Sequence, residues 1–135
     1  MHKSRLAGLV IDCRVDDLDA AARFWSDALG YRAVRDPEDP KYVKLETPDG
    51  EIVMLLQQVE HDSRVHLDIE TDDTEAEAAR LEALGAKRIA AIKRWIVMEA
   101  PTGHRFCVVN PQRPDFSEHA NAWSETPPRR SGEAN

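Results

Sequence analysis

Five side chains that could do chemistry lie inside short apolar segments of the chain. His66 and Asp68 are two residues apart in HLDIET, Asp12 lies in LVIDCRV, and Arg105 and Cys107 are two residues apart in HRFCVVN. A histidine oriented by a carboxylate can act as a general base near neutral pH, and an arginine can clamp a substrate carboxylate. These residues therefore suggest proton transfer on a small organic molecule, with His66 as the base and Arg105 as the clamp.

Structural interpretations of the same residues remain open. His66 could be a histidine whose ring is satisfied inside the protein, since buried polar groups are normally hydrogen-bonded. Asp12 and Asp68 could form ion pairs with Arg14 and Arg105 and so only neutralise charge. The sequence alone does not choose between the catalytic and the structural interpretation.

The two cysteines, Cys13 and Cys107, lie in apolar runs, and no adjacent motif marks either one as a nucleophile. We expect both to be small buried hydrophobic residues. His66 and Cys107 could also offer two donors to zinc. Two donors are too few, so a third would have to come from Asp12, Asp68 or another chain.

Other kinds of site lack support in the sequence. No GxGxxG, GxxxxGKS/T, GxSxG or HExxH motif occurs, so nothing indicates a nucleotide site, a hydrolase nucleophile elbow or a zincin site. The remaining histidines fall at ends, at turns or on the opposite strand face, and we expect them to be exposed: His2, His61, His104 and His119.

The segments that must position these side chains occur as two similar copies in the sequence. ETPDGEIVMLLQ (46–57) is echoed by EAPTGHRFCVVN (99–110), and IDCRVDDLDAA (11–21) is echoed by LDIETDDTEAE (67–77). Such internal similarity indicates a duplicated structural unit. The chain is therefore expected to contain two copies of one module.

Each copy reads as strand, helix and three strands. In the first copy, LAGLVIDCRV has the length of a strand, and the next segment has apolar residues at helical spacing. Asp16 and Asp72 are expected to cap the helices, and Gly30 is expected at a left-handed helix end. Three further strands, bounded by Pro, Gly and Asp, complete each βαβββ module. The fold class is α+β.

A folded part and a C-terminal extension are expected. We assign them these ranges: domain 1–112, modules 7–60 and 63–111, extension 113–135. Within the extension, Phe116 and Trp123 could anchor a short wrap on the folded body. The polar, Pro-containing residues 124–135 are expected to be disordered, because they cannot bury enough apolar surface.

Composition restricts the partners and the compartment. The length suits one domain with an ordinary core, and the formal net charge of −7 argues against binding to nucleic acid. The chain has only two cysteines and no long uncharged apolar stretch at its start. We therefore expect a cytoplasmic protein that does not bind membranes.

The two βαβββ modules, the segment RVDDLDAAARFW and the closing strand GHRFCVV resemble the vicinal oxygen chelate superfamily. This superfamily includes glyoxalase I, bleomycin-resistance proteins and extradiol dioxygenases. The resemblance covers residues 7 to 111. It implies an open, incomplete eight-stranded barrel whose concave face holds the active site, usually in a homodimer.

The resemblance also implies where metal ligands would stand. In metal-dependent members they come from the first and last strands of each module, which here correspond to Val10, Met54, His66 and Cys107. A valine has no donor atom, and a methionine thioether is too soft for a hard divalent ion. We therefore expect no cofactor, although a divalent metal stays possible.

Strand alternation then predicts which further side chains line the implied cavity, because side chains two residues apart share a face. Asp12 shares the face of Val10, Asp68 shares the face of His66, and Arg105 shares the face of Cys107. Trp95 could be either a core residue or a pocket wall. The apolar positions expected in the same cavity are Ile52, Met54, Leu56 and Val109.

Three functions follow as alternatives. The first is a protein that binds a small organic ligand without a working metal centre, as bleomycin-resistance proteins do. The second is a lyase, isomerase or dioxygenase of the same superfamily with a metal-free or rebuilt site and His66 as base. The third is a ligand-independent interaction module. Loss of turnover but not of binding in His66→Ala would favour the enzyme.

Overall fold

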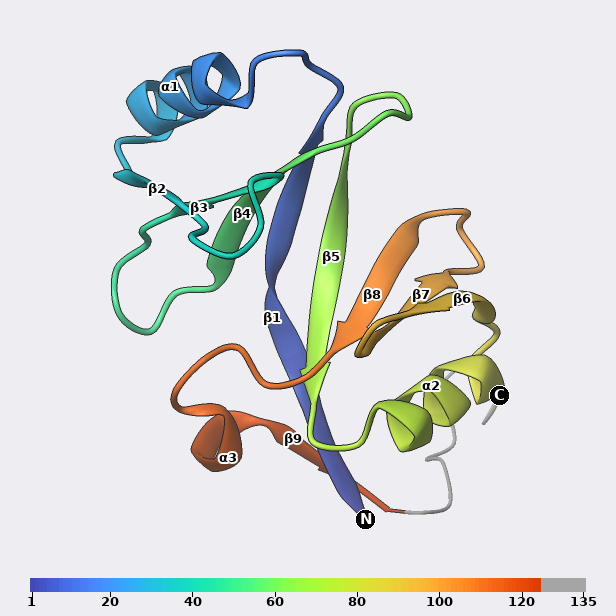
Figure 1. Ribbon diagram of the computed structural model, residues 1–135. Coiled ribbons are helices and arrows are strands. Elements are labelled where there is room, and N and C mark those ends of the chain that lie inside the picture. The colour runs from blue at the N-terminus through green and yellow to red at the C-terminus, as the bar shows by residue number, and fades with distance from the viewer. Residues whose placement is uncertain (125–135) are drawn as a thin grey trace. The chain divides into compact units, whose positions relative to one another are not determined.

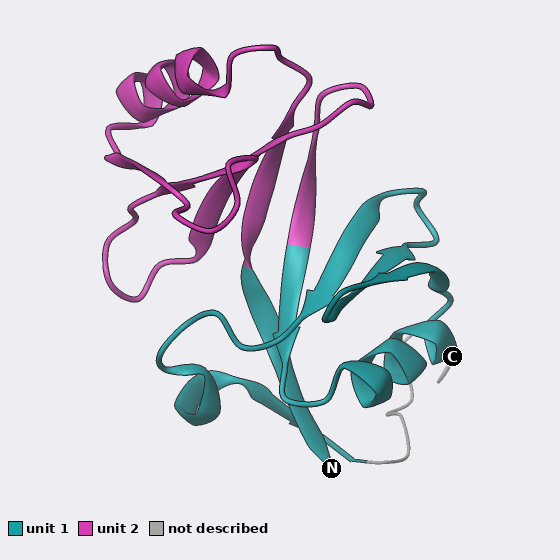
Figure 2. Cartoon of the chain, viewed as in Figure 1, with its two compact units in different colours: residues 1–7, 68–135 teal, residues 8–67 magenta. Residues whose placement is uncertain are grey.

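The computed structural model describes residues 1–124, which divide into two compact units (Figure 2). One unit holds residues 8–67, and the other holds residues 1–7 together with the chain from residue 68 onward. Strands β1 (His2–Cys13) and β5 (Arg64–Thr71) contribute to both units. The disorder predicted for residues 124–135 falls almost entirely outside the described residues.

The unit of residues 8–67 contains the first module. Its elements follow the end of β1 in this order: α1 (Leu18–Leu29), β2 (Ala33–Arg35), β3 (Tyr42–Leu45) and β4 (Val53–Gln58). Hydrogen-bonded neighbours in this unit run in the order β2-β3-β4-β1-β5, and β2 forms an open edge (Figure 1). The predicted βαβββ order is confirmed here.

Helix α1 begins and ends at residues whose chemistry suits a helix terminus. The Asp17 side chain accepts a hydrogen bond from the backbone N–H of Ala20, and Gly30 ends the helix with φ of 77°. Asp73 caps α2 (Thr74–Ala83) in the same way through the N–H of Ala76. Each cap therefore lies one residue after the aspartate that the sequence predicted, within the usual uncertainty of helix ends.

One face of the sheet in this unit packs against α1. The buried core contains Ile11, Cys13, Leu18, Ala22, Val43, Leu45 and Leu56. Leu9, Ile11 and Cys13 belong to this face of β1, so Val10 and Asp12 lie on the other face. The burial predicted for Cys13 is confirmed, and Asp12 is placed opposite the helix.

The other unit contains the second module and the C-terminal elements. Its elements after β5 are α2 (Thr74–Ala83), β6 (Lys87–Ile92), β7 (Trp95–Glu99), β8 (Arg105–Val109), α3 (Phe116–His119) and β9 (Asn121–Trp123). Neighbours run β1-β5-β8-β7-β6, with β9 on β1 and β6 at an open edge. No helix within residues 1–124 is long and apolar enough to cross a membrane.

The core of this unit lies under α2. It consists of Ala78, Leu81, Ile96, Met98, Phe106 and Val108. His2 also lies inside this unit and is only 6% exposed, because its ring donates to the carboxylate of Glu77 over 2.8 Å. The prediction that His2 is exposed is therefore wrong: a buried acid 75 residues away in sequence binds it.

The chain after β8 is anchored to its own unit by several contacts. The side chain of Phe116 is buried, and the indole N–H of Trp123 donates to Ser4 Oγ over 2.8 Å. The carboxylate of Glu70 accepts hydrogen bonds from the backbone N–H groups of Gln112 and Arg113. Both predicted anchors, Phe116 and Trp123, make contacts of the kind expected.

Candidate functional site

A histidine and a buried aspartate meet in the unit of residues 8–67. The Nδ1–H of His66 on β5 donates to Oδ2 of Asp12 on β1 over 2.8 Å. The two side chains are 12% and 2% exposed, respectively. Because an ionised carboxylate only accepts hydrogen bonds, Nδ1 carries the proton of the neutral ring, and Nε2 is its basic nitrogen. The pair thus fixes the tautomer that a general base requires.

Two further basic groups surround the same carboxylate oxygen. The Arg64 Nε lies 3.8 Å from Oδ2 of Asp12, and the His61 Nε2 lies 3.9 Å from it. Oδ1 of Asp12 is buried and has no hydrogen-bond partner in the described chain. Asp12 pairs with these groups and not with Arg14, which binds Asp62.

Arg64 and His61 were missed as site residues by the sequence reasoning. A signal for Arg64 was present, since it precedes His66 by two residues and so shares its face of β5. No comparable signal existed for His61. It lies in the turn before β5, and only the folded turn brings its ring near Asp12.

Met54 is not where the sequence placed it. It packs against the α1 core, as does Leu56, whereas the sequence pattern predicts both in a cavity with Val10. Leu55 is the residue paired with Val10 in the parallel register of β1 and β4, so it shares the face of Val10. The position predicted for an inherited metal ligand is therefore held by leucine, which also lacks a donor atom.

The error arises from one residue of loop length. The two modules match at their turn glycines, Gly50 and Gly103, but β4 begins at Val53 and β8 begins at Arg105. The first loop is thus longer by one residue. Because side chains alternate along a strand, this single insertion turns every aligned side chain of β4 to the opposite face.

The other unit holds the remaining predicted site residues. On β8, Phe106 and Val108 face the α2 core, so Arg105 and Cys107 lie on the opposite face. The Arg105 guanidinium donates to Glu99 on β7 over 3.2 Å, so a carboxylate already occupies the predicted clamp. Trp95 is half-buried and alternates with the core residue Ile96, which puts it on the Arg105 side and not in the α2 core.

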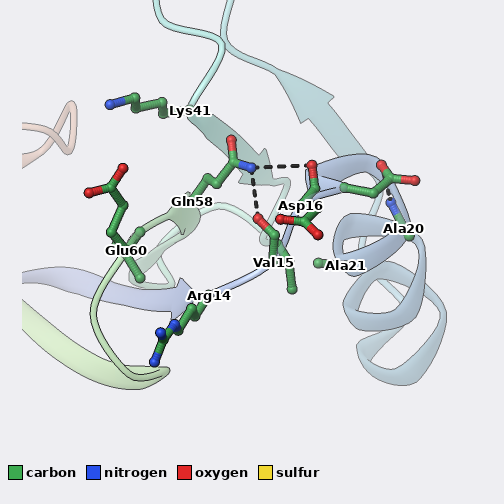
Figure 3. Close-up of a pocket in the computed structure, with 10 residues that line it drawn as sticks. Arg14, Val15, Asp16, Ala20, Ala21, Lys41, Gln58 and Glu60 are labelled. Carbon is green, nitrogen blue, oxygen red and sulfur yellow. Dashed lines mark hydrogen bonds between the residues drawn. The ribbon is translucent and has the colours of Figure 1, made fainter.

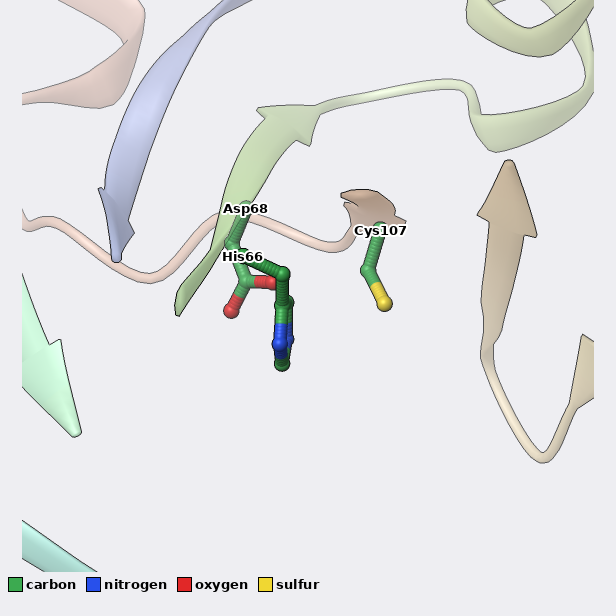
Figure 4. Close-up of side chains that lie close together, drawn as sticks. All are labelled: His66, Asp68 and Cys107. Carbon is green, nitrogen blue, oxygen red and sulfur yellow. The ribbon is translucent and has the colours of Figure 1, made fainter. Parts of the chain in front are cut away.

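Cys107 also takes part in a group of possible metal donors. Asp68 of β5 and Cys107 place a carboxylate oxygen and a thiol sulfur within 4.8 Å of each other. His66, two residues before Asp68 on β5, belongs to the same group of three (Figure 4). A nitrogen, an oxygen and a sulfur donor would suit a zinc-like ion, but not a hard ion that requires oxygen ligands.

A separate surface hollow lies at the start of α1, with Val15, Asp16, Lys41, Gln58 and Glu60 among its lining residues (Figure 3). The Gln58 amide donates to the carbonyl oxygens of Val15 and Asp16. The central polar group of this hollow is thus satisfied by the backbone. The hollow shares no residue with the Asp12–His66 pair.

The comparisons with known proteins agree with this architecture. A family model described as a glyoxalase-like domain matches residues 8–109. The chain belongs to the glyoxalase-like domain family. This confirms the predicted kinship with the vicinal oxygen chelate superfamily. A comparison with curated proteins found no match.

Several solved structures are similar to this chain in fold. Methylmalonyl-CoA epimerase from Mycobacterium tuberculosis has a TM-score of 0.58 at 18% identity, covering 84% of this chain and 91% of that one. A Streptomyces coelicolor methylmalonyl-CoA epimerase variant in complex with 2-nitronate-propionyl-CoA has a TM-score of 0.57 at 18% identity, covering 79% and 96%. A hypothetical protein from Bacillus halodurans has a TM-score of 0.58 at 11% identity, covering 82% and 96%. At these identities the likeness shows the fold alone.

Proposed function

We propose that this protein binds a small organic molecule beside Asp12 and His66, and that His66 transfers a proton on that molecule. The reaction class is that of an isomerase or lyase acting at a carbon next to a carbonyl group. The observation that carries the proposal is the 2.8 Å hydrogen bond between His66 Nδ1 and the buried Asp12 carboxylate.

The pair suits proton transfer for two physical reasons. Asp12 holds the imidazole in one tautomer and one orientation, and it stabilises the imidazolium that forms when His66 takes a proton. In the proposed step, the C–H bond breaks, the proton moves to Nε2, and the electron pair is delocalised onto the carbonyl oxygen. Return of the proton to the opposite face of that carbon, or to the neighbouring carbon, completes an isomerisation.

The neighbouring residues suit an organic ligand. Val10 and Leu55 give the same face of β1 and β4 an apolar floor next to the polar pair. A few polar groups on an apolar surface are typical of small-molecule sites. Structural neighbours named as methylmalonyl-CoA epimerases support carbonyl compounds as the first substrates to test.

The metal implied by the superfamily does not fit the inherited positions, because Val10 and Leu55 supply no donor atom. No step is therefore assigned to a metal at those positions. If an ion binds elsewhere, His66, Asp68 and Cys107 are the donors that would hold it. Elemental analysis of protein purified without chelator, beside His66→Ala, tests this directly: bound metal that is lost in the variant would contradict a metal-free site.

The proposed activity is tested by deuterium incorporation. We expect wild-type protein in D2O to exchange the acidic C–H of a carbonyl substrate, with methylmalonyl-CoA as the first compound in the panel. His66→Ala should lose this exchange while still binding the compound. His104→Ala is the matched control, because His104 lies exposed after a turn and its ring bonds to Thr102. Equal exchange in both variants would exclude His66 as the base.

Binding without turnover is the second candidate. It is favoured by the apolar residues Val10 and Leu55 at positions where metal-dependent relatives are expected to hold ligands. A compound that binds wild-type protein tightly and shows no exchange in D2O would favour this reading. A bleomycin-resistance-like role would then be tested by growth of expressing cells on bleomycin.

We also infer a homodimer in a reducing cytoplasm. Two free cysteines are compatible with that compartment. The open sheet edges at β2 and β6 expose backbone groups that a second copy could cover. Sedimentation of the full chain as a monomer at micromolar concentration would contradict the dimer.

A further inference from the structure

Arg64 differs from Arg14 and Arg35 of the same unit, because it has no hydrogen-bonded acid among the described residues. Its side chain is 48% exposed, and its Nε stays 3.8 Å from the Asp12 carboxylate. The other close polar atom is Nε2 of His61, 3.4 Å from an Arg64 terminal nitrogen. Within residues 1–124, no carboxylate oxygen lies within hydrogen-bond distance of this guanidinium.

Two exposed arginines of the same unit are each hydrogen-bonded to an acid. Arg14 donates to Asp62 over 2.8 Å, and Arg35 donates to Asp19 over 2.7 Å. A planar guanidinium binds carboxylates and phosphates through two parallel hydrogen bonds when such an acceptor is available. Arg64 has the charge and the exposure for such an acceptor, but the described chain does not supply one.

The position of Arg64 ties it to the proposed base. It precedes His66 by two residues on β5 and therefore shares its strand face. The His61 ring lies beside Arg64, and its Nδ1–H donates to the Asp62 carbonyl over 2.8 Å. That bond leaves Nε2 of His61 as an acceptor, and it lies 3.4 Å from a terminal nitrogen of Arg64, so His61 orients the guanidinium.

Proton transfer to His66 does not use the charge of Arg64. When His66 takes a proton, its imidazolium pairs with Asp12 over 2.8 Å. The charge of Arg64 is then still available for a different partner. An anion at Arg64 would also be held near the carbon that His66 deprotonates, which is the kind of positioning that accelerates a reaction.

We propose that the substrate carries an anionic group, a carboxylate or a phosphate, which Arg64 binds beside the Asp12–His66 pair. This inference rests on the proposed function, because it names the substrate class of the same site. It replaces the clamp expected at Arg105, whose guanidinium is engaged by Glu99.

The test uses the full chain, labelled with nitrogen-15, and small probes followed by NMR. Malonate and inorganic phosphate are titrated separately, and neutral malonamide serves as the uncharged analogue. We expect shifts at residues 61–66 with one or both anions and none with malonamide. Malonate alone would assign a carboxylate, and phosphate alone would assign a phosphate group.

Arg64→Gln should weaken anion binding at least about tenfold, the size expected for loss of one charge-assisted contact. Arg35→Gln is the matched control, an exposed arginine of the same unit that has its own acidic partner. Backbone spectra confirm that both variants are folded. Equal weakening in the two variants, or equal shifts with malonamide and malonate, would overturn the inference.

The outcome separates this inference from the proposed function. Anion binding that depends on Arg64, with no exchange in D2O, would sustain the anion site and reject the catalytic role. Exchange could instead require His66, proceed equally well on neutral and anionic carbonyl compounds, and stay unchanged in Arg64→Gln. That outcome would sustain the catalysis and reject the anion site.

Discussion

The two units bury carboxylates in opposite ways. In the unit with α2, Glu77 is fully buried and its oxygens accept hydrogen bonds from His2 and from two nitrogens of Arg80. In the unit of residues 8–67, Asp12 is 2% exposed, its Oδ2 is held by His66, and its Oδ1 has no partner in the described chain.

This difference indicates that the two carboxylates have different roles, one structural and one functional. A buried carboxylate costs free energy unless it is paired and hydrogen-bonded, and Glu77 is fully compensated by residues that hold the N-terminal strand against α2. Asp12 is compensated on one side only, and its partners include a histidine of suitable geometry for proton transfer. We interpret Glu77 as a stabilising residue and Asp12 as a residue kept for the site.

Glu77→Gln should give the largest effect on stability. The change leaves the buried His2 and the partly buried Arg80 without a charged partner, and breaking a buried ion pair costs about 3–5 kcal/mol. The free energy of unfolding in urea measures this loss. Glu75→Gln is the control: Glu75 is exposed and pairs with Arg88, and surface pairs contribute under about 1 kcal/mol. Similar losses of unfolding free energy in the two variants would show that Glu77 stabilises its unit no more than an exposed acid does.

Asp12→Asn should show the converse behaviour. We expect the rate of proton exchange to fall about 10²-fold or more, which is the typical contribution of an oriented general base. The loss of stability should be smaller than that of Glu77→Gln, since Asp12 is only partly compensated in the wild type. Asp62→Asn, at an exposed acid that pairs with Arg14, should keep the full rate. A larger loss of stability than of rate would make Asp12 a structural residue like Glu77.

Gly8→Ala should damage the unit of residues 8–67. A Cβ atom at Gly8 would lie 2.0 Å from the carbonyl oxygen of Val53, so β1 and β4 would have to move apart. Overpacking of this kind costs about 1–3 kcal/mol. Hydrogen exchange should show faster exchange in β1 and β4 and little change in α2. Uniform acceleration across the chain would instead indicate that the units do not unfold separately.

Acid should weaken the Glu77 network by a smaller amount. Burial would raise the pKa of Glu77, but hydrogen bonds from Arg80, His2 and Ser4 outweigh it and hold the pKa below the ordinary value of 4.5. A depressed pKa means that the unfolded state takes up the proton first. The contribution of the ionised Glu77 to the free energy of unfolding is therefore complete above about pH 4.5, and it is lost as the pH falls through the pKa of Glu77 in the folded state.

The stability of wild-type protein and Glu77→Gln as a function of pH checks this sign. The difference between their free energies of unfolding should narrow below about pH 4.5, since only the wild type has the Glu77 carboxylate to protonate. A difference that widens on acidification would show that Glu77 is protonated more easily in the folded state than in the unfolded state.

Much of the fold could be predicted because its signals are local. The duplicated segments gave both βαβββ modules, and the apolar spacing of α1 gave the helix that covers the first core. Pairing Val10 with His66 placed Asp12 on the correct strand face. Cap positions erred by one residue, since Asp16 and Asp17 are both good caps and only the backbone geometry chooses between them.

What the sequence determined by itself is therefore the order of the elements, the apolar face of α1 and the presence of His66 on a strand with an acid available. Only the tertiary structure decided which acid binds His66, that Glu99 engages Arg105, and that Arg64 lies near Asp12. It also turned Met54 into the α1 core. The physical reason is that alternation along one strand is a local property. Which faces of two strands coincide depends instead on loop length and register, and a shift of one residue turns every side chain of a strand to the opposite face.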